Sequence, residues 1–592
     1  MIFGKYVNRF YLKYFWNFFF GVLFLVVIDI TQSFIPELLA SLSKHDEQGT
    51  LTQTIVNQIG LQLLIIAIVM LIGRFIWRIC ILNGAHKIAA DLREDMFVKS
   101  TKLSQNFYSK NKVGSIMSYY TNDLDTIHEA YGWGTVMLVD SIFLSALSFI
   151  KMMKVDISLS LICLIPLAIL VSFAYIIDNK MEKTYEKRQK AFESMSDYAQ
   201  ELFTGIRVIK AFTREKSSAK KFAKVNENNK QKDLSLVKFN AFLDAAFTIL
   251  IEAMMVIGMS IGAYFIYNSY LGKEGFSFSR DQLVEFIGHL NIIIWPMIAL
   301  GQIIALRARA KTSLKRISKL LDEEIDVKDG SKVTLVDKIE GNITFKDFTY
   351  YYKNNNNPAL KNITLEIKQG ENVGIVGKVG SGKTSLVSIL LRLDNFTLNK
   401  VFIDGIDIMN LPLKQVRDNV SFVPQDNFLF STTIEDNVSF SDKNLSQEEI
   451  IEACEFADVH SNISDFINGY KTLVGERGVT LSGGQKQRIS IARAYIKKAP
   501  IMILDDSVSA VDIKTEEKII NNIKLKRKGK TTIIVASRVS TVMHLDKIIV
   551  MNNGEIEAIG SHEELLEKSP TYSRMVFLQE LEKEVEGGDF NE

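Results

Sequence analysis

Leu481-Ser482-Gly483-Gly484-Gln485 is the centre of the pattern that decides the fold of the C-terminal half of this chain. Upstream of it, Gly377-Lys378-Val379-Gly380-Ser381-Gly382-Lys383-Thr384 has the form G-x-x-x-x-G-K-[ST]. The backbone N–H groups of such a loop surround the phosphates of ATP, its lysine meets the outer phosphates, and its last hydroxyl faces Mg2+. Downstream, the apolar stretch Ile501–Leu504 runs into Asp505 and Asp506, where a metal-binding aspartate belongs. The loop alone would leave many classes of nucleotide hydrolase open.

The serine–glycine stretch stands in the longer setting Val474–Gln485, and together with the loop and the acidic strand it resembles the nucleotide-binding domain of ABC transporters. In that family this motif closes over ATP bound to a partner subunit. The resemblance therefore implies a dimer, in which Ser482, Gly483, Gly484 and Gln485 complete the partner's site.

The resemblance assigns further residues to the nucleotide. Tyr352, expected before the first strand, matches the aromatic residue that stacks on adenine, although it is one of three neighbouring tyrosines that could be surface or core residues. Gln425 matches a glutamine that meets Mg2+ and senses the membrane domain, and Asp512 matches a loop that communicates across the dimer. The implied nucleotide-binding residues are Tyr352, Gly377, Gly380, Ser381, Gly382, Lys383, Thr384, Ser385 and Gln425, and the implied Mg2+ ligands are Thr384, Gln425 and Asp505.

Two residues at the expected catalytic positions depart from the family pattern. The residue after Asp505 is usually Glu, the base that orients the attacking water, but here it is Asp506, which is one methylene shorter. A displacement of about 1 Å at a catalytic group can cost roughly a hundredfold in rate. Ser537 stands where the family usually has His, and a hydroxyl lacks the reach and the proton chemistry of an imidazole. These residues predict a site that binds ATP and hydrolyses it slowly.

The intact Ser482–Gln485 motif indicates that the site it completes is active. Family members that pair two different half-transporters combine one weak site with one active site. We therefore expect a non-identical partner half-transporter, with Glu and His at the positions of Asp506 and Ser537. A homodimer with two weak sites is the alternative.

The composition points to two domains in different environments. The chain has 592 residues, which is too long for a single core, and its long apolar runs are confined to the first half. It carries 70 Lys and Arg against 68 Asp and Glu, a net charge of +2, so there is no electrostatic case for a nucleic-acid partner. The three cysteines have no paired spacing and are expected to be packing thiols.

Six stretches are long and apolar enough to span a lipid bilayer as helices: Phe15–Ala40, Ile55–Gly73, Tyr131–Ile150, Ile157–Ile177, Ala241–Tyr267 and Leu283–Leu306. The first is too long for the core of a secretory signal, so we expect it to be retained. Lys and Arg are concentrated in the N-terminus and in the connections after the second and fourth stretches, which places both termini and the ATP-binding half in the cytoplasm.

The two long connections, Arg74–Glu129 and Asp178–Asn240, keep apolar residues at helical spacing and contain almost no Gly or Pro. They are expected to extend the membrane helices into the cytosol, because neither is long enough to form a separate domain. This resembles the exporter-type ABC fold, in which such extensions end in coupling helices that press on the nucleotide-binding domains. By resemblance these helices lie near Lys112–Tyr119 and Gly205–Glu215.

The predicted fold class is an all-α membrane domain of six helices with long cytosolic extensions, followed by an α/β phosphate-loop ATPase domain. The expected bounds are 1–322 for the membrane domain, 323–338 for a linker, 339–585 for the nucleotide-binding domain and 586–592 for an acidic tail. Apolar runs that include Asn372–Val376, Thr531–Ala536 and Lys547–Met551 predict a mainly parallel sheet, and Asn553-Gly554 predicts a hairpin turn.

Ionisable residues within membrane spans are costly and mark function or pairing between helices. Those within the predicted spans are Asp29, Glu37, Asp140, Asp244, Glu252, Glu285 and His289. Asp29, Asp140 and Glu252 are the deepest, and we expect them in a substrate cavity that suits cationic amphiphiles. By resemblance the chain exports drugs or other amphiphilic small molecules across the cytoplasmic membrane of a bacterium by alternating access. A lipid or peptide exporter, and an ATP-gated channel or regulatory subunit, are the alternatives.

Overall fold

The computed structural model describes residues 4–273, 277–330, 333–353, 355–475, 478, 480–508 and 511–587. The chain divides into two compact units. A helical unit comprises Met1–Thr101 and Val113–Glu323, and an α/β unit comprises Lys102–Lys112 and Glu324–Glu592. The α/β unit therefore includes a short piece of the first long connection as well as the C-terminal half.

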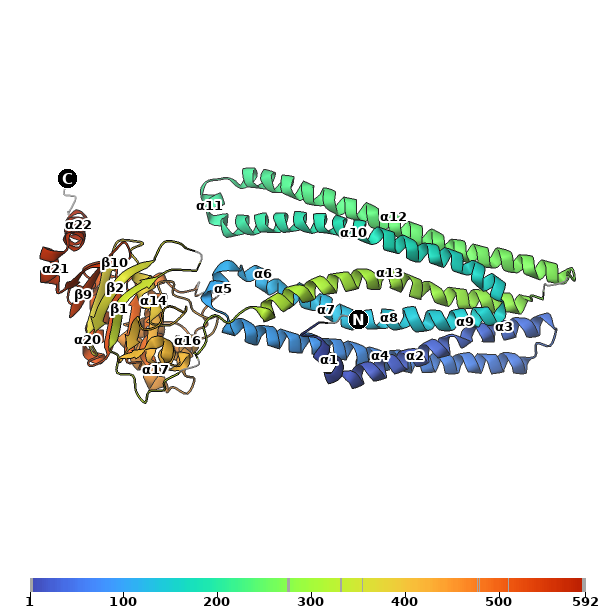
Figure 1. Cartoon of the computed structure of the whole chain (residues 1–592), viewed down its shortest axis with the longest axis horizontal. Coiled ribbons are helices and arrows are strands. Elements are labelled where there is room, and N and C mark those ends of the chain that lie inside the picture. Colours follow the sequence, from blue (N-terminus) through green and yellow to red (C-terminus); the bar gives the residue numbers. More distant parts are fainter. Residues whose placement is uncertain are drawn as a thin grey trace. The chain divides into compact units, whose positions relative to one another are not determined.

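The helical unit is built from long helices that run back and forth (Figure 1). Its elements are α1 (Asn8–Lys13), α2 (Phe15–Gln32), α3 (Phe34–Glu47), α4 (Gln53–Lys102), α6 (Val113–Ser118), the π-helical turn η1 (Tyr119–Asp123), α7 (Leu124–Tyr131), α8 (Trp133–Val139), the π-helical turn η2 (Asp140–Leu144), α9 (Ser145–Val155), α10 (Ile157–Thr204), α11 (Ile206–Ala211), α12 (Glu215–Tyr270) and α13 (Arg280–Asp322). Because α4, α10 and α12 each continue without a break from a predicted span well into the neighbouring connection, the expected extension of the membrane helices is confirmed.

Within the described residues, five helical stretches are long and apolar enough to cross a membrane: Phe15–Glu47, Gln53–Lys102, Val113–Val155, Glu215–Tyr270 and Arg280–Asp322. They contain five of the six predicted spans. The fourth predicted span lies in the 48-residue helix α10, of which Ile157–Pro166 is apolar. Several side chains in the rest of that span lie outside the described residues.

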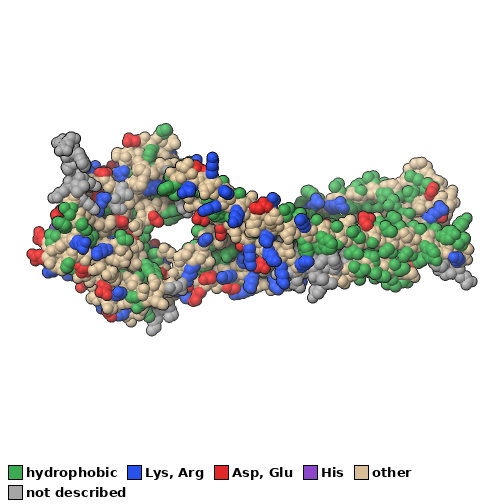
Figure 2. Space-filling model, turned by 90° about the horizontal axis from the view of Figure 1, so that it is seen from above, with side chains coloured by type: hydrophobic (Ala, Val, Ile, Leu, Met, Phe, Trp, Pro, Cys, Tyr) green, Lys and Arg blue, Asp and Glu red, His purple; other side chains and the backbone are tan. Residues whose placement is uncertain are grey.

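Hydrophobic side chains cover much of the surface of the helical unit (Figure 2). Leu71, Phe75 and Ile249 are each about two-thirds exposed or more, at 71%, 68% and 67%. Apolar surface of this extent is unfavourable in water and is typical of a face that contacts lipid.

The predicted position of the first coupling helix was wrong. The short helix of the first connection is α5 (Gln105–Lys110), and Lys112–Tyr119 instead begins the returning helix. The cause is local: Asn111 adopts an extended conformation, and its side-chain amide donates to the carbonyl of Phe107 at 2.9 Å, which ends α5. A short helix, α11, does lie within the second predicted range, Gly205–Glu215, and its role as a coupling helix stays a prediction.

The α/β unit contains two sheets (Figure 1). A four-stranded antiparallel sheet has the order β2-β1-β4-β5, and a six-stranded sheet has the order β10-β9-β3-β8-β7-β6, in which only β10 is antiparallel to its neighbour. The elements after α5 are β1 (Ile343–Tyr350), β2 (Leu360–Ile367), β3 (Asn372–Gly377), α14 (Lys383–Ile389), β4 (Val401–Ile403), β5 (Ile406–Asp407), α15 (Leu413–Asn419), β6 (Val420–Val423), α16 (Ile434–Val438), α17 (Gln447–Phe456), α18 (His460–Ser464), α19 (Gly483–Ile496), β7 (Ile501–Asp505), α20 (Ile513–Lys526), β8 (Thr531–Val535), β9 (Lys547–Asn552), β10 (Glu555–Gly560), α21 (His562–Lys568) and α22 (Pro570–Gly587).

The predicted parallel sheet is confirmed. Its central strands β7 and β8 are buried along their whole length, as expected for strands covered on both faces. The predicted hairpin is also present, since Asn553 and Gly554 join β9 to β10 with positive φ angles of 49° and 84°. Helix α22 continues to Gly587, so it includes the first two residues of the predicted acidic tail.

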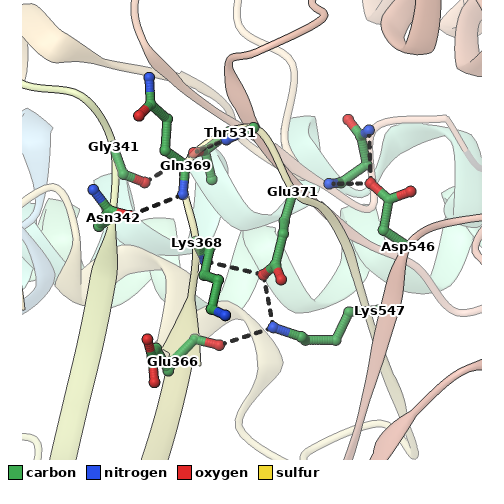
Figure 3. Close-up of polar contacts among 11 residues, drawn as sticks. Gly341, Asn342, Glu366, Lys368, Gln369, Glu371, Thr531, Asp546 and Lys547 are labelled. Atoms are coloured by element: carbon green, nitrogen blue, oxygen red, sulfur yellow. Dashed lines mark hydrogen bonds and ion pairs between the residues drawn. The ribbon is translucent and has the colours of Figure 1, made fainter.

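Polar contacts fix the beginning of β3, the strand that leads into the phosphate loop (Figure 3). Lys547 and Glu371 form an ion pair of 2.6 Å, and the backbone N–H of Gly370 donates to the hydroxyl of Thr531 at 3.2 Å. That hydroxyl in turn donates to the carbonyl of Gly341 at 2.8 Å. Because Gly341 precedes β1 and Thr531 begins β8, the turn before β3 is tied to both sheets.

Candidate functional site

At two positions of the phosphate loop, no residue larger than glycine fits. A Cβ on Gly377 would lie 2.2 Å from the carbonyl oxygen of Met551, and one on Gly382, where φ is +96°, would lie 2.9 Å from that of Ala359. The loop folds around Lys383, whose Nζ donates to the carbonyls of Gly377 and Lys378 at 2.7 and 2.9 Å. Burial lowers the pKa of Lys383, and the nearby carboxylates of Asp506 and Asp505 act in the opposite direction.

Replacement of Gly377 by Ala is expected to destabilise the α/β unit by about 3 kcal/mol, because the new methyl group cannot avoid the carbonyl of Met551. Thermal unfolding of the purified chain, followed by scanning calorimetry, measures this. Gly483→Ala is the matched control, since a Cβ there meets nothing within 4 Å. Equal shifts in the two variants would contradict the steric explanation.

An acidic edge lies next to the loop. Strand β7 pairs in parallel with β8, which brings Asp505 opposite Val535, and Asp505 Oδ1 accepts a hydrogen bond of 3.1 Å from the hydroxyl of Thr384. Asp505 is only 1% exposed, and burial raises its pKa while the Thr384 bond opposes that shift. Gln425 follows β6 at the same edge, because Val423 pairs with Leu504. Hydroxyl, carboxylate and amide oxygens are the ligands that Mg2+ prefers, so these residues fit that ion.

The two departures from the family pattern contact each other. The hydroxyl of Ser537 donates to Asp506 Oδ1 at 3.2 Å. Asp506 has a positive φ of 46°, and its backbone N–H donates to the carbonyl of Val535 at 2.9 Å, which fixes the turn after β7. The two substitutions, which the sequence presents as separate, therefore form one hydrogen-bonded pair.

Tyr352 lies two residues after β1, so the expectation that it precedes the first strand was wrong. Its hydroxyl is 2.8 Å from that of Ser385 in α14, and its ring meets Tyr350 nearly edge-on, at 5.1 Å between centroids. Tyr350 is buried and Tyr351 faces solvent. Of the three tyrosines, Tyr352 is therefore the one whose hydroxyl reaches the helix that follows the phosphate loop.

A cavity of about 200 Å³ lies beside Tyr352 and Thr384, and α5 forms one of its walls. Two carboxylates that no sequence pattern indicates hold α5 here. Asp394 accepts from Asn106 of α5 at 2.8 Å and from the hydroxyl of Tyr350 at 2.9 Å.

Asp326 forms the second bridge. It accepts from Ser104, just before α5, at 3.3 Å and from Lys353, just after Tyr352, at 2.6 Å. Single Asp and Asn residues in polar loops give no sequence pattern, which is why neither bridge was predicted. Together the two bridges connect α5 to Tyr350 and Lys353, which lie on either side of Tyr352 in the sequence.

The serine–glycine motif forms the beginning of α19. Ser482 caps the helix, because its hydroxyl accepts from Gln485 N–H at 3.2 Å and Gln485 Oε1 accepts from Ser482 N–H at 3.0 Å. Ser482 and Gly483 are exposed, and Gly484 and Gln485 are partly exposed. This helix start is therefore accessible to a ligand carried by another subunit.

Asp512 caps α20 in the same way, by accepting from Thr515 N–H at 3.0 Å, and this bond lowers its pKa. Ser509 and Ala510, shortly before Asp512, lie outside the described residues, as do Glu476, Arg477 and Val479.

The acidic residues of the membrane spans have different environments. Asp29 is buried in α2, and Asp140 is buried in η2, where it accepts from the indole N–H of Trp295 at 2.8 Å. Glu252, the third expected cavity residue, is exposed on α12. Glu37 pairs with Lys151, just beyond the third predicted span, at 2.7 Å.

Comparison with known proteins agrees with this architecture. Residues 18–297 match the family model of the ABC transporter transmembrane region, and residues 360–509 match the ABC transporter model. The chain is 32% identical to the probable multidrug resistance ABC transporter ATP-binding/permease protein YheI of Bacillus subtilis (strain 168), over 99% of both chains. It is 34% identical to the multidrug resistance-like ATP-binding protein MdlA of Escherichia coli (strain K12), over 96% of this chain and 95% of that protein.

The structure of a bacterial Atm1-family ABC exporter with ATP bound has the same fold, with a TM-score of 0.84 and 23% identity over 97% of this chain and 100% of that one. The chain thus belongs to the ABC transporter family, as a multi-pass membrane exporter whose fused C-terminal domain binds ATP and couples its hydrolysis to transport.

Proposed function

We propose that this chain is one half of a heterodimeric exporter of drugs or other amphiphilic molecules, and that its own ATP site hydrolyses slowly. The observation that carries the proposal is the 3.2 Å contact between Ser537 and Asp506. A carboxylate one methylene shorter than Glu, paired with a hydroxyl in place of an imidazole, orients the attacking water less well than the Glu and His that the family uses.

In this site Tyr352 stacks on adenine, while the loop glycines, Ser381, Lys383 and Ser385 bind the phosphates. Thr384, Asp505 and Gln425 would hold Mg2+, which would supply positive charge at the phosphate oxygens. Lys383 adds a positive charge at the outer phosphates, and Asp506 faces the water that attacks them. Asp512 communicates across the dimer interface.

The partner's site is completed by the Ser482–Gln485 motif, whose first residues are exposed at the start of α19. A partner with Glu and His at the positions of Asp506 and Ser537 then supplies most of the hydrolysis. This arrangement gives the dimer one weak and one active site.

The proposed substrate class rests on two observations. The relatives YheI and MdlA are named for multidrug resistance, and Asp29 and Asp140 are buried carboxylates within the helical unit that can pair with a cationic amphiphile. Export would occur across the cytoplasmic membrane of a bacterium, with the ATPase domain and both termini in the cytoplasm. A lipid or peptide substrate and an ATP-gated channel are the competing possibilities, and a current that persists without ATP would favour the channel.

Purification from the native host tests the heterodimer directly. A second, different ABC half-transporter should co-purify in equal amount, and ATP hydrolysis and drug transport in vesicles should require both chains. If this chain alone forms a stable dimer that hydrolyses ATP and transports at the full rate, the heterodimer proposal is wrong.

Asn106→Ala is expected to weaken coupling between ATP hydrolysis and transport, because it removes one bond by which α5 shares Asp394 with Tyr350. Loss of a hydrogen bond to a charged group changes an equilibrium by roughly tenfold or more, so we expect drug-stimulated ATPase activity to fall about tenfold. Basal ATPase activity should change less than twofold.

Ser109→Ala is the matched control on the same helix, since the hydroxyl of Ser109 donates within α5, to the carbonyl of Asn106. Unchanged drug stimulation in Asn106→Ala would show that this contact is not used for coupling.

A further inference from the structure

One side chain of the C-terminal helix α22 holds the switch segment, defined here as Ser537–Val539. Gln579 Oε1 accepts from the backbone N–H of Val539 at 2.8 Å, and Gln579 Nε2 donates to the carbonyl of Ser537 at 3.4 Å. The last sheet bond before this segment is made by Ala536, whose N–H donates to Ile375 of β3 at 3.0 Å. Beyond that point, the amide of Gln579 takes the place of a neighbouring strand.

Helix α22 is anchored well enough to position this amide. Tyr572 is fully buried, and its hydroxyl lies 2.8 Å from Nδ1 of His562. Val576 packs against the same hydrophobic core. Tyr572, Val576 and Gln579 follow the i, i+4, i+7 spacing of one helix face, so the face that docks the helix also directs Gln579 to the switch segment.

The two bonds of Gln579, here called the clamp, are connected to the catalytic groups through Ser537. The carbonyl of Ser537 is bound by Gln579, while the hydroxyl of the same residue donates to Asp506 at 3.2 Å. The preceding residue, Asp505, accepts from Thr384 of the phosphate loop. An unbroken series of hydrogen bonds and adjacent residues thus links α22 to the phosphate loop.

We infer that Gln579 is a positioning residue for ATP hydrolysis at this chain's own site: it fixes the switch segment so that Ser537 keeps Asp506 in place. The inference rests on the proposed function only in taking Asp506 as the residue that faces the attacking water. Because a displacement of about 1 Å at a catalytic group can change a rate roughly a hundredfold, loss of the clamp should be measurable in turnover. Nucleotide affinity should be unaffected, because Gln579 contacts the switch segment and not the phosphate loop.

Two substitutions separate the two bonds of the clamp. Gln579→Ala removes both. Gln579→Glu keeps an acceptor for Val539 N–H but places a carboxylate oxygen against the carbonyl of Ser537, where no donor remains. Phe577→Ala is the matched control, since Phe577 lies on the same helix and is 59% exposed.

The experiment uses the full-length chain in lipid nanodiscs, in whichever dimer it forms when purified. Hydrogen exchange of the Val539 amide reports the clamp itself, and steady-state ATP hydrolysis at this chain's own site reports its consequence. In Gln579→Ala we expect Val539 to exchange about tenfold faster and kcat of this site to fall roughly two- to tenfold, the range that one or two net hydrogen bonds can produce. KM for ATP should stay within about twofold of the wild-type value, Gln579→Glu should show the same direction of change, and Phe577→Ala should leave all three quantities unchanged.

Unchanged exchange at Val539 in Gln579→Ala would overturn the inference, and so would faster exchange with an unchanged kcat, which would make the clamp purely structural. The outcome is separable from that of the proposed function. If Asp506→Glu with Ser537→His does not raise turnover while Gln579→Ala lowers kcat, the weak-site proposal fails and the positioning role stands. The reverse result sinks the positioning role alone.

Discussion

Replacing Asp506 by Glu together with Ser537 by His should raise ATP hydrolysis at this chain's own site about a hundredfold. The longer carboxylate moves by roughly the length of one methylene toward the water, and a shift of about 1 Å at a catalytic group is worth roughly that factor. The imidazole adds a group whose proton affinity suits chemistry near neutral pH.

The two changes should not be additive. Ser537 and Asp506 share a hydrogen bond of 3.2 Å, so each single substitution disturbs the partner that remains. We therefore expect the increases in turnover of Asp506→Glu and Ser537→His, multiplied together, to be smaller than the increase of the double variant. Two independent defects would instead give a product equal to the increase of the double variant.

The measurement must separate the two sites of the dimer. Vanadate trapping of a radiolabelled, photoreactive ATP analogue, followed by separation of the two chains on a gel, shows which chain has turned over nucleotide. Asp506→Asn with Ser537→Ala is the control, because it replaces the same two side chains without supplying a base. If the double variant traps nucleotide no better than this control, Asp506 and Ser537 are not the cause of slow hydrolysis.

Replacing Ser482 by Asp should lower the steady-state ATPase activity of the complex about a hundredfold and leave the folded chain intact. Ser482 caps α19 through the N–H of Gln485, and Asp is as good a capping residue as Ser. A carboxylate, however, places negative charge where the motif meets a triphosphate, and loss of one preorganised donor at a reacting phosphate or acyl group already costs about a hundredfold.

Thermal unfolding provides the stability control for this prediction, with Ser482→Thr as the variant that keeps a hydroxyl. Both variants should unfold close to the wild-type temperature, and only Ser482→Asp should lose activity. Labelling by photoreactive ATP should be lost from the partner chain and retained on this one. Loss of label from this chain instead would mean that the motif contacts nucleotide in its own subunit.

The regular elements of this fold could be predicted because each has a local signal. Strands β7 and β8 are continuous apolar runs, and the hairpin after β9 has the Asn553-Gly554 pair whose positive φ angles that turn requires. Likewise, the membrane helices are marked by apolar length alone. In these cases the residues that determine the structure are neighbours in sequence.

The parts that could not be predicted depend on residues that are distant in sequence. Asp506 meets Ser537 because β7 and β8 pair with Asp505 opposite Val535, and the strand register is not visible in either strand taken separately. No local pattern marks Gln579, and its contact with Val539 depends on the docking of α22 through Tyr572.

The first coupling helix was misplaced for a local reason. The bond from the Asn111 side chain to the carbonyl of Phe107 lies where α5 ends, and the nearest glycine, Gly114, lies inside the next helix and so does not mark that boundary.

The α/β unit is formed by two segments that are far apart in the sequence, Lys102–Lys112 and Glu324–Glu592. During synthesis on the ribosome, this early segment emerges long before the surface that receives it, and the intervening helices must enter the bilayer in the meantime. Complete folding of the α/β unit therefore depends on membrane insertion of the helices between its two parts. A fragment that begins at Glu324 would lack Asn106 and Ser104, which donate hydrogen bonds to Asp394 and Asp326 in the whole protein.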